Sequence, residues 1–217
     1  MERSRSQRGG RRAEAARNDG RILAAARSVF LADPSAPIAD VAKEAGVGIS
    51  ALYRRYPSKE ELLRELAGDG LTRYIADLRT ALADDGDPWQ VYSACLHRVV
   101  DGGSQALAQR VAGTFTPTES LGRLAGEASE LAIAVHARTQ RAGALRPDVS
   151  PADVVLILEM ISFVDLPGPD RGRALRHRYL ALALQALRAP GSEPLPGAPA
   201  AAADLTARWQ GPLGKKR

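Results

Sequence analysis

Proline and glycine divide the N-terminal part of this sequence into segments that can form only short helices. Pro34 ends the first helical segment, because proline disfavours helix in the residue before it. Pro37 is tolerated in the first turn of the next helix. Gly46 stops that second helix, Gly48 belongs to the tight turn that follows, and Pro57 closes a third short helix. The chain must therefore bend sharply more than once between residues 34 and 57.

Apolar residues recur at helical spacing on both sides of these breaks, which predicts helices with one buried face. The first helix follows the potential cap residues Asn18 and Asp19 and ends near Asp33. The third helix runs roughly from Ile49 to Tyr56, and a fourth, capped by Ser58, continues to the Asp- and Gly-rich cluster at residues 84–88. The expected buried positions of the first two helices are Ile22, Leu23, Ala26, Val29, Phe30, Ile38, Val41, Ala42 and Ala45.

Beyond residue 88 the chain continues in Ala- and Leu-rich segments that Gly and Pro separate. We predict helices at about residues 88–101, 104–115, 118–143, 150–165 and 171–188. Aromatic residues make up only 5% of the sequence, so the core must depend on Ala, Leu, Val and Ile. The predicted fold class is all-α. The stretch from Pro190 to Ala203 is rich in Pro, Gly and Ala, so residues 190–217 are expected to form a flexible tail.

The net charge of +5 is unevenly distributed. Residues 1–83 contain 15 basic and 11 acidic residues, residues 84–189 contain 11 and 12, and residues 190–217 contain 4 and 2. The N-terminal excess favours a polyanionic partner, although a solvated charged surface would give the same count. Residues 1–17 contain six arginines without apolar periodicity, which predicts a disordered basic arm. This arm either enters a DNA minor groove or is a solubilising tail.

The composition argues against several other classes of protein. Cys95 is the only cysteine, so no intramolecular disulfide can form, and no Cys and His residues have zinc-site spacing. His97, His136 and His177 fall on different helices, which argues against a metal sensor. The apolar run at residues 154–164 is too short to span a bilayer, and no signal core follows the Arg-rich N-terminus. We therefore expect a cytoplasmic protein without a metal, cofactor or membrane partner.

Three stretches of the N-terminal part resemble the DNA-binding domain of the tetracycline-repressor (TetR) family. They read RILAAARSVF at residues 21–30, IADVAKEAG at residues 38–46 and AGVGISALYRRYPSKEELL at residues 45–63. In the last stretch the family usually has AGV, a small residue, a few variable positions, LY, two polar or basic residues, an aromatic residue and SKE. The resemblance covers about 45 consecutive residues.

The resemblance implies both an architecture and a function. A helix-turn-helix domain of three helices at residues 18–65 would bind double-stranded DNA, and a long fourth helix would join it to a second helical domain. That domain, at residues 66–189, would dimerise and enclose a small-molecule effector. The expected protein is a transcriptional regulator, acting as a repressor, that binds a palindromic operator as a homodimer and is released by its effector. No enzymatic activity is expected.

The third helix is the expected recognition helix. Its N-terminal turn would enter the major groove first, so Ile49, Ser50 and Ala51 would lie nearest the base edges, and the residues that follow would reach phosphates. Tyr56, in contrast, is expected to pack in the core. The complete set of residues expected to contact DNA is Gly48, Ile49, Ser50, Ala51, Tyr53, Arg54, Arg55 and Lys59.

The sequence departs from the family pattern at two places. Ser50 and Ala51 stand where many members have Gly and Thr, so a hydroxyl that usually contacts DNA is moved or lost. Pro37 and Ile38 stand where many members have Thr at the start of the second helix, which puts a phosphate contact there in doubt. The operator therefore cannot be copied from a relative.

The C-terminal half offers candidates for the dimer interface and the effector site. Residues 137–158, ARTQRAGALRPDVSPADVVLIL, resemble a recurrent type of C-terminal domain in the same family. Apolar stripes on the last two helices suit an isologous four-helix interface, and they would equally suit an intramolecular core. The dimer candidates are Val154, Val155, Leu158, Ile161, Leu175, Tyr179, Leu182 and Leu187. The effector-site candidates, for which core packing is the alternative, are Trp89, Tyr92, Leu96, Phe115 and Leu131.

Two other functional classes remain as alternatives. One is an enzyme on a helical fold, but the sequence has no Ser/His/Asp or Cys/His set with a local signature and no phosphate-binding Gly loop. The other is an interaction module whose helix-turn-helix no longer binds DNA. Substitution of Tyr53 and Lys59 separates them, because only a DNA-binding protein would lose affinity for DNA.

Overall fold

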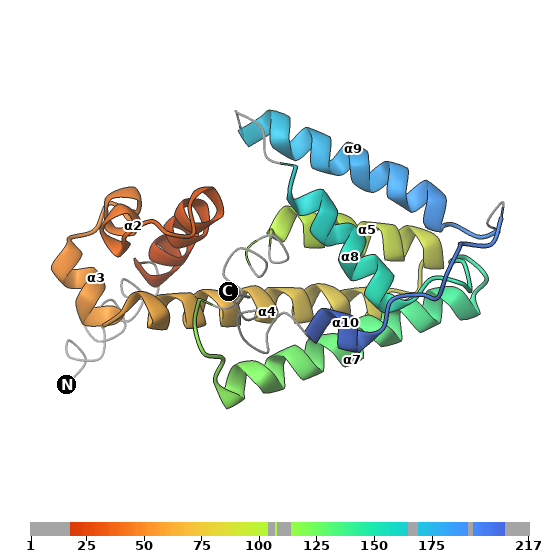
Figure 1. The fold of residues 1–217 in the computed structure, drawn as a ribbon, viewed down its shortest axis with the longest axis horizontal. Helices are drawn as coiled ribbons and strands as arrows, with labels where there is room; N and C mark the ends of the chain where they lie inside the picture. Colours follow the sequence, from red (N-terminus) through yellow and green to blue (C-terminus); the bar gives the residue numbers. More distant parts are fainter. Residues whose placement is uncertain (1–17, 104–106, 108–113, 165–168, 191–192, 207–217) are drawn as a thin grey trace, which may run out of the picture. The chain divides into compact units, whose positions relative to one another are not determined.

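The computed structural model describes residues 18–103, 107, 114–164, 169–190 and 193–206. The chain divides into two compact units, residues 1–66 and 67–217, and the division falls within helix α4 (Lys59–Ala83). Figure 1 shows the helices of both units. The described residues form helices without a β-strand, apart from one isolated bridge between Leu145 and Arg188. The prediction of an all-α fold is confirmed.

The first unit is built from four helical segments. Residues 18–32 are helical and are followed by α2 (Ile38–Ala45), α3 (Ile49–Arg55) and the beginning of α4. Phe30, Val41, Leu52 and Leu62 are fully buried and form the centre of this unit's core. These are the apolar positions that recur at helical spacing, so each short helix is stabilised chiefly by packing its apolar face against the others.

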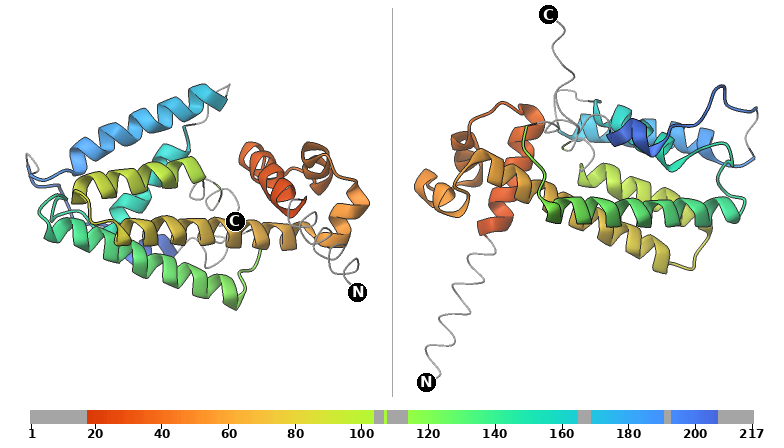
Figure 2. Two further views of the ribbon diagram at one scale, coloured as in Figure 1. Left: turned by 180° about the vertical axis from the view of Figure 1, so that it is seen from behind. Right: turned by 60° about the horizontal axis from the view of Figure 1, so that its bottom comes forward.

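The described part of the second unit contains the rest of α4 and five further helices that can be given bounds. They are α5 (Pro88–Gly102), α7 (Glu119–Arg141), α8 (Pro151–Ser162), α9 (Pro169–Leu187) and α10 (Ala202–Thr206). Helix α5 packs against α7 and α9, and α8 packs against α7 and α9. Figure 2 shows α5 and α9 side by side. A single apolar core with Trp89, Leu145 and Leu180 among its members joins these helices.

Helix ends follow local sequence signals. The Ser58 hydroxyl accepts a hydrogen bond from the backbone N–H of Glu61 at 3.1 Å, so the predicted cap of α4 is confirmed. Asp87 caps α5 through Gln90 N–H at 2.9 Å. Ser150 and Asp153 form a reciprocal capping box at the start of α8. These bonds satisfy backbone donors that the first helical turn leaves without a partner.

The expected helix at residues 104–115 lies largely outside the described residues. Of its described positions, Leu107 is helical, whereas residues 114–115 form a bend. The basic arm at residues 1–17 also lies outside the described residues. None of the helices in the described part is long and apolar enough to cross a membrane.

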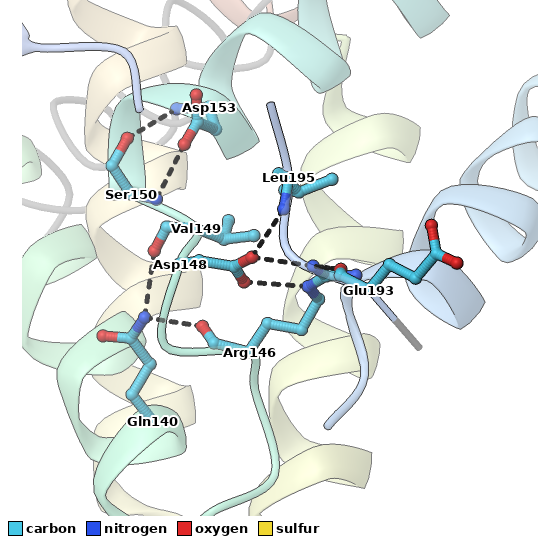
Figure 3. A network of polar contacts seen from close by, with 8 residues as sticks. All are labelled: Gln140, Arg146, Asp148, Val149, Ser150, Asp153, Glu193 and Leu195. Carbon is cyan, nitrogen blue, oxygen red and sulfur yellow. Dashed lines mark hydrogen bonds and ion pairs between the residues drawn. The ribbon is translucent and has the colours of Figure 1, made fainter. Parts of the chain in front are cut away.

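Residues 193–206 are attached to the turn between α7 and α8, although their composition predicts a flexible segment. Arg146 donates to the backbone carbonyl of Glu193 at 2.6 Å, and Asp148 accepts from the backbone N–H of Leu195 at 3.0 Å (Figure 3). Ser150 donates its hydroxyl proton to the carbonyl of Ala200 at 2.8 Å. A Pro- and Gly-rich composition favours an open chain but cannot show which polar groups lie within reach.

The same network holds the turn itself. Arg146 and Asp148 form two parallel hydrogen bonds of 2.9 and 2.7 Å, the bidentate geometry that suits a guanidinium and a carboxylate. Gln140 donates to the carbonyls of Arg146 and Val149 at 2.8 and 2.9 Å (Figure 3). The stretch RAGALRPDV, residues 141–149, therefore contains a turn whose Arg146 and Asp148 side chains bind the backbone of residues 193–195.

Candidate functional site

The turn between α2 and α3 requires glycine at residue 46. Gly46 has a φ of 64°, in the left-handed region that L residues rarely adopt. Its N–H and that of Val47 bond to the carbonyls of Lys43 and Ala42 at 3.1 and 3.0 Å, which closes the end of α2. A Cβ on Gly46 would lie 3.1 Å from the guanidinium of Arg21. The backbone conformation at this position selects glycine, and a Cβ would also require the Arg21 guanidinium to shift slightly.

Side chains from outside the motif hold the helix-turn-helix in place. Arg21, in the first helical segment, donates to the carbonyl of Ala45 at 2.6 Å and so satisfies an acceptor at the end of α2. Asp19 accepts from Nε of Arg55 at 3.0 Å, at the end of α3. Sequence reasoning did not assign these roles, because the partners are 24 and 36 residues apart.

Helix α3 has one buried face and one exposed face. Leu52 is completely buried and Tyr56, just after the helix, is 2% exposed, so the expectation that Tyr56 packs in the core is met. Ile49 and Tyr53, four residues apart, are 40% and 47% exposed. Ser50 and Arg54 are exposed beside them, Gly48 is exposed, and Ala51 is half-buried. The helix therefore presents an apolar residue, an aromatic phenol, a hydroxyl and a guanidinium to solvent on adjoining positions.

The four residues expected to reach phosphates differ in their surroundings. Tyr53 and Arg54 are exposed. Arg55 forms an ion pair with Asp19 and lies 4.8 Å from the ring of Tyr56, and the hydrogen bond to Asp19 raises the pKa of its guanidinium. Lys59 is half-buried, and its ammonium donates to the carbonyls of Pro34 and Ala36, each at 2.8 Å.

The placement of Lys59 departs from the expectation of a phosphate ligand on the surface. Its ammonium also lies 5.0 Å from the centre of the Phe30 ring. Two of its three N–H donors are used inside the first unit, which leaves one for an external acceptor. Lys59 therefore holds residues 34–36 against the start of α4.

Four of the five effector-site candidates are buried, and two of the five line a small cavity between described residues. Trp89, Tyr92, Leu96 and Phe115 are at most 8% exposed, and Leu131 packs against the core. Tyr92 and Leu96 line a cavity of about 30 Å³, together with residues of α4, α7 and α8. This volume accommodates roughly one or two water molecules. Trp89, Phe115 and Leu131 do not line it.

His136 lies beside this cavity and was not among the candidates. Its Nε2 lies 3.0 Å from the carbonyl of Val149, and its Nδ1 lies 3.3 Å from the Tyr92 hydroxyl. Burial lowers the pKa of His136, which favours the neutral ring. A carbonyl only accepts, so Nε2 carries the proton and Nδ1 accepts from Tyr92. The spacing of 44 residues between Tyr92 and His136 left no sequence signal for this pair.

Half of the dimer candidates belong to the core of the second unit, which corrects their expected position on a surface. Val154, Leu158, Ile161 and Leu187 are each at most 6% exposed and pack within the apolar cluster. Val155 and Leu175 are half-buried, whereas Tyr179 and Leu182 are 48% and 52% exposed. Helix α8 is apolar all round, so its periodicity could not distinguish the inner face from the outer one.

The outer face of α8 and α9 forms an apolar groove. Met160 and Phe163 are both 65% exposed, although sequence reasoning did not select them. The groove has a volume of about 570 Å³ and is lined by Ile157, Met160, Ile161, Phe163, Val164, Leu175, Tyr179 and Ala183. An apolar groove of this kind, open to solvent, is typical of a surface that another molecule covers.

Comparison with protein families matches residues 22–66 to the family described as bacterial regulatory proteins, tetR family. These residues include α2, α3 and the start of α4, the segment that presents Ile49, Ser50, Tyr53 and Arg54. Residues 22–66 therefore carry a domain of the TetR family. The members of this family are bacterial regulatory proteins. In this chain, the second unit follows the matched domain in the sequence.

A curated TetR relative matches over part of its length. The HTH-type transcriptional repressor LfrR of Mycolicibacterium smegmatis is 41% identical over 81 residues. The match covers 37% of this chain and 40% of the relative, so the chain is aligned with about two fifths of that repressor.

Solved TetR structures match most of the chain. A TetR transcriptional regulator from Streptomyces coelicolor is 29% identical, with a TM-score of 0.56, and the match covers 78% of this chain and 98% of that one. LfrR from Mycobacterium smegmatis, solved in complex with proflavine, is 23% identical, with a TM-score of 0.61 and coverage of 83% and 99%. The likeness in fold to these regulators therefore extends through the second unit.

The three histidines lie on three different helices, as the sequence indicated, but two of them are in contact. His97 of α5 and His177 of α9 have their Nδ1 atoms 2.8 Å apart, and Asp101 accepts from Nε2 of His177 at 2.8 Å. The packing of α5 on α9 brings together residues that lie 80 positions apart. The described residues contain no group of three or more His, Cys, Asp or Glu that could hold a metal ion.

Proposed function

We propose that this transcriptional regulator binds a two-fold symmetric DNA operator as a homodimer, represses transcription there and is released by a small-molecule effector. The exposed face of α3 carries the proposal. Ile49 and Tyr53 are large side chains held in solvent by a helix whose opposite face is anchored by the buried Leu52. A short helix that exposes such residues is suited to contact base edges and phosphates in a major groove.

Within this interface the residues have different tasks. Ser50 can donate to or accept from a base, and Ile49 and Ala51 can contact a thymine methyl group. Tyr53 and Arg54 contact phosphates, and Arg55 and Lys59 mainly hold the domain together while offering their remaining donors. Gly48 allows the backbone at the start of α3 to approach the DNA.

The basic arm supplies most of the positive charge for DNA binding. Residues 1–17 contain six arginines and two glutamates, whereas residues 18–83 contain nine basic and nine acidic residues. The N-terminal excess therefore comes entirely from residues 1–17. Each phosphate that this arm neutralises would steepen the dependence of binding on salt concentration.

The dimer forms through the apolar groove of α8 and α9. Two copies that place Met160, Phe163, Tyr179 and Leu182 against each other would bury the most exposed apolar side chains of these two helices. Leu175 also lines the groove, and both it and Val155 of α8 are half-buried. Two recognition helices related by two-fold symmetry then bind half-sites about one helical turn of DNA apart.

The effector binds around Tyr92 and Leu96, where the small cavity expands to receive it. The cavity is lined by Tyr74, Leu78, Tyr92, Cys95, Leu96, Val99, Ala132, Val135, His136, Pro151, Val154, Val155 and Leu158, none of them a carboxylate or a strong base. The relative LfrR has been solved in complex with the small molecule proflavine. The lining of this chain suits a neutral, largely apolar compound with one or two hydrogen-bonding groups.

The test is selection of DNA by the purified chain from a library of random duplexes, followed by mobility-shift titration. The expected result is a palindromic sequence. Tyr53→Ala and Arg54→Met should weaken binding, and Arg54→Met should lower the salt slope by about 0.9 per lost phosphate contact. Arg79→Met, which removes an equal charge from an exposed ion pair in the second unit, is the matched control.

Two outcomes would reject the proposal. One is that no sequence is enriched at low salt. The other is that Tyr53→Ala and Arg54→Met bind as tightly as Arg79→Met, which is the result expected of an enzyme or an interaction module with an inactive helix-turn-helix.

A further inference from the structure

Two histidines from different helices meet in the second unit. The Nδ1 atoms of His97 in α5 and His177 in α9 are 2.8 Å apart, and the ring centres are 5.0 Å apart with an interplanar angle of 13°. Rings in nearly the same orientation with this N–N distance are joined by a hydrogen bond, in which one nitrogen donates and the other accepts.

The opposite side of His177 fixes part of the proton arrangement. Its Nε2 lies 2.8 Å from Oδ1 of Asp101, and Nε of Arg173 lies 2.9 Å from the same oxygen. Burial raises the pKa of Asp101, but the hydrogen bonds from His177 and Arg173 outweigh it and hold the pKa below its ordinary value. Asp101 is therefore an ionised acceptor, and Nε2 of His177 carries a proton.

The number of protons on the two rings determines whether the hydrogen bond between their Nδ1 atoms can form. In a neutral pair, His97 donates from Nδ1 to His177. In a pair with one positive charge, His177 donates from Nδ1 to His97 and remains paired with Asp101. A second positive charge would place two N–H groups head to head, and the hydrogen bond would be lost.

The surrounding charges favour the state with one proton between the rings. Burial lowers the pKa of His97, and the neighbouring His177 lowers it further, whereas Asp101 opposes both effects. Two other arginines near the contact are occupied elsewhere. Arg98 pairs with Asp77 of α4 at 3.1 Å, and Arg176 donates to the carbonyl of Val164 at 3.1 Å. Among the described residues, the charged and titratable groups at the contact are His97, Asp101, Arg173 and His177.

A bound metal ion would need a different geometry. Two nitrogens at zinc-bond length and a tetrahedral angle lie about 3.3 Å apart. The observed 2.8 Å suits a proton between the rings, and Asp101 binds the far nitrogen of His177 instead of converging on the same point.

We infer that His97 and His177 form a pH-dependent clasp between α5 and α9, which holds while a single proton lies between their Nδ1 atoms and opens when a second charge is added. The folded-state pKa of His97 lies below its ordinary value of about 6.5. The stabilisation is therefore present above that pH and is lost as the pH falls through the folded-state value.

The clasp also bears on the proposed dimer, and this step rests on the proposed function. Leu175 and Tyr179 line the apolar groove and lie two residues before and after His177. Two residues along an α-helix correspond to about 200°, so the clasp holds α9 by the face opposite the groove. Opening it frees the first half of α9 to shift, which weakens the dimer under acidic conditions.

The first test is an NMR titration of protein labelled with ¹⁵N in its histidine rings, between pH 8 and pH 5. The chain has three histidines, so single variants assign the signals. His97 should titrate below the ordinary histidine value, because burial and the neighbouring His177 lower its pKa. In His177→Gln, the titration of His97 should move back toward the ordinary value. His136→Gln, as a control, should leave the titration of His97 unchanged. A titration of His97 that is the same in His177→Gln as in the wild type would overturn the clasp.

The second test separates the clasp from the dimer. Sedimentation equilibrium should give a dimer dissociation constant that rises as the pH is lowered from 7.5 and the clasp opens. The double variant His97→Gln/His177→Gln should show a much smaller rise. A coupled titration in a chain that is monomeric at every pH supports the clasp and rejects the dimer. A dimer with equal pH dependence in both proteins rejects the link between them.

Discussion

Lys59 illustrates how a residue of a recognition motif can stabilise the fold that carries it. Its ammonium bonds to two backbone carbonyls at 2.8 Å and lies near the Phe30 ring, whereas Arg54, also basic and close in sequence, is exposed. The motif alone suggested the same role for both residues. Their different surroundings mean that only one of them can be changed without affecting the stability of the domain.

Replacing Lys59 by Met should therefore destabilise the first unit. Loss of hydrogen bonds from a charged donor costs about 1.5–3 kcal/mol, and the two carbonyls lose their partner. Arg54→Met should change the free energy of unfolding by no more than about 0.5 kcal/mol. Urea unfolding followed by circular dichroism measures both variants. Equal stabilities for the two would show that the Lys59 contacts contribute nothing.

Gly46 is the residue on which the turn between the two helices depends. Gly46→Ala should lower the stability of the first unit by at least about 1 kcal/mol, because its φ of 64° is unfavourable for alanine and Arg21 lies 3.1 Å from the new Cβ. Gly20→Ala is the matched control, since Gly20 is helical and a Cβ there meets nothing within 4 Å. That variant should be slightly more stable than the wild type. Thermal melts should show a melting temperature below that of the wild type for Gly46→Ala and slightly above it for Gly20→Ala.

At the scale of elements, the attachment of residues 193–206 depends on the turn between α7 and α8. Asp148→Asn removes the charge that pairs with Arg146, so the segment should detach and its backbone amides, Leu195 among them, should exchange faster with solvent. Glu193→Gln is the control, because only the backbone carbonyl of Glu193 enters the network. Hydrogen exchange read by mass spectrometry distinguishes the two. Unchanged protection in Asp148→Asn would show that the network does not hold the segment.

The same attachment has a definite dependence on pH. The hydrogen bonds from Arg146 hold the pKa of Asp148 far below its ordinary value of about 4. A carboxylate with a lowered folded-state pKa stabilises the fold above its unfolded-state value, and this contribution disappears as the pH falls through the folded-state value. Protection of residues 193–206 should therefore persist as the pH falls through the range in which the His97–His177 clasp opens. If the protection of residues 193–206 and the His97–His177 contact were lost at the same pH, this prediction would be wrong.

At the scale of the whole molecule, the proposed function depends on two copies of the chain. Phe163→Glu places a charge in the apolar groove of α8 and α9, and sedimentation should then show a monomer of 23.1 kDa. Operator affinity should fall by a factor of about 10²–10⁴, because the second half-site no longer benefits from the first. Ile133→Glu, at an apolar residue of α7 that is 50% exposed, is the matched control. A dimeric Phe163→Glu protein would place the interface elsewhere.

The interpretation of the sequence succeeded where the signal was local. The short helices around Gly46, the cap of α4 at Ser58 and the burial of Tyr56 each depend on residues within a few positions of one another. The motif that follows Gly46 is also contiguous, so the family resemblance could be recognised from the sequence. Helix α10 was missed, because five residues in a Pro- and Ala-rich segment have too little periodicity to predict a helix.

By itself, the sequence determined the all-α class, the helix-turn-helix and the outward-facing residues of its third helix, because helical periodicity and turn chemistry act over a few residues. Tertiary packing alone decided which face of α8 is buried, why Lys59 turns inward, and that His97 meets His177. The sequence of a helix that is apolar all round does not indicate which face is buried. The sequence around a polar group does not indicate a partner that lies tens of residues away. Those contacts arise only when the helices pack.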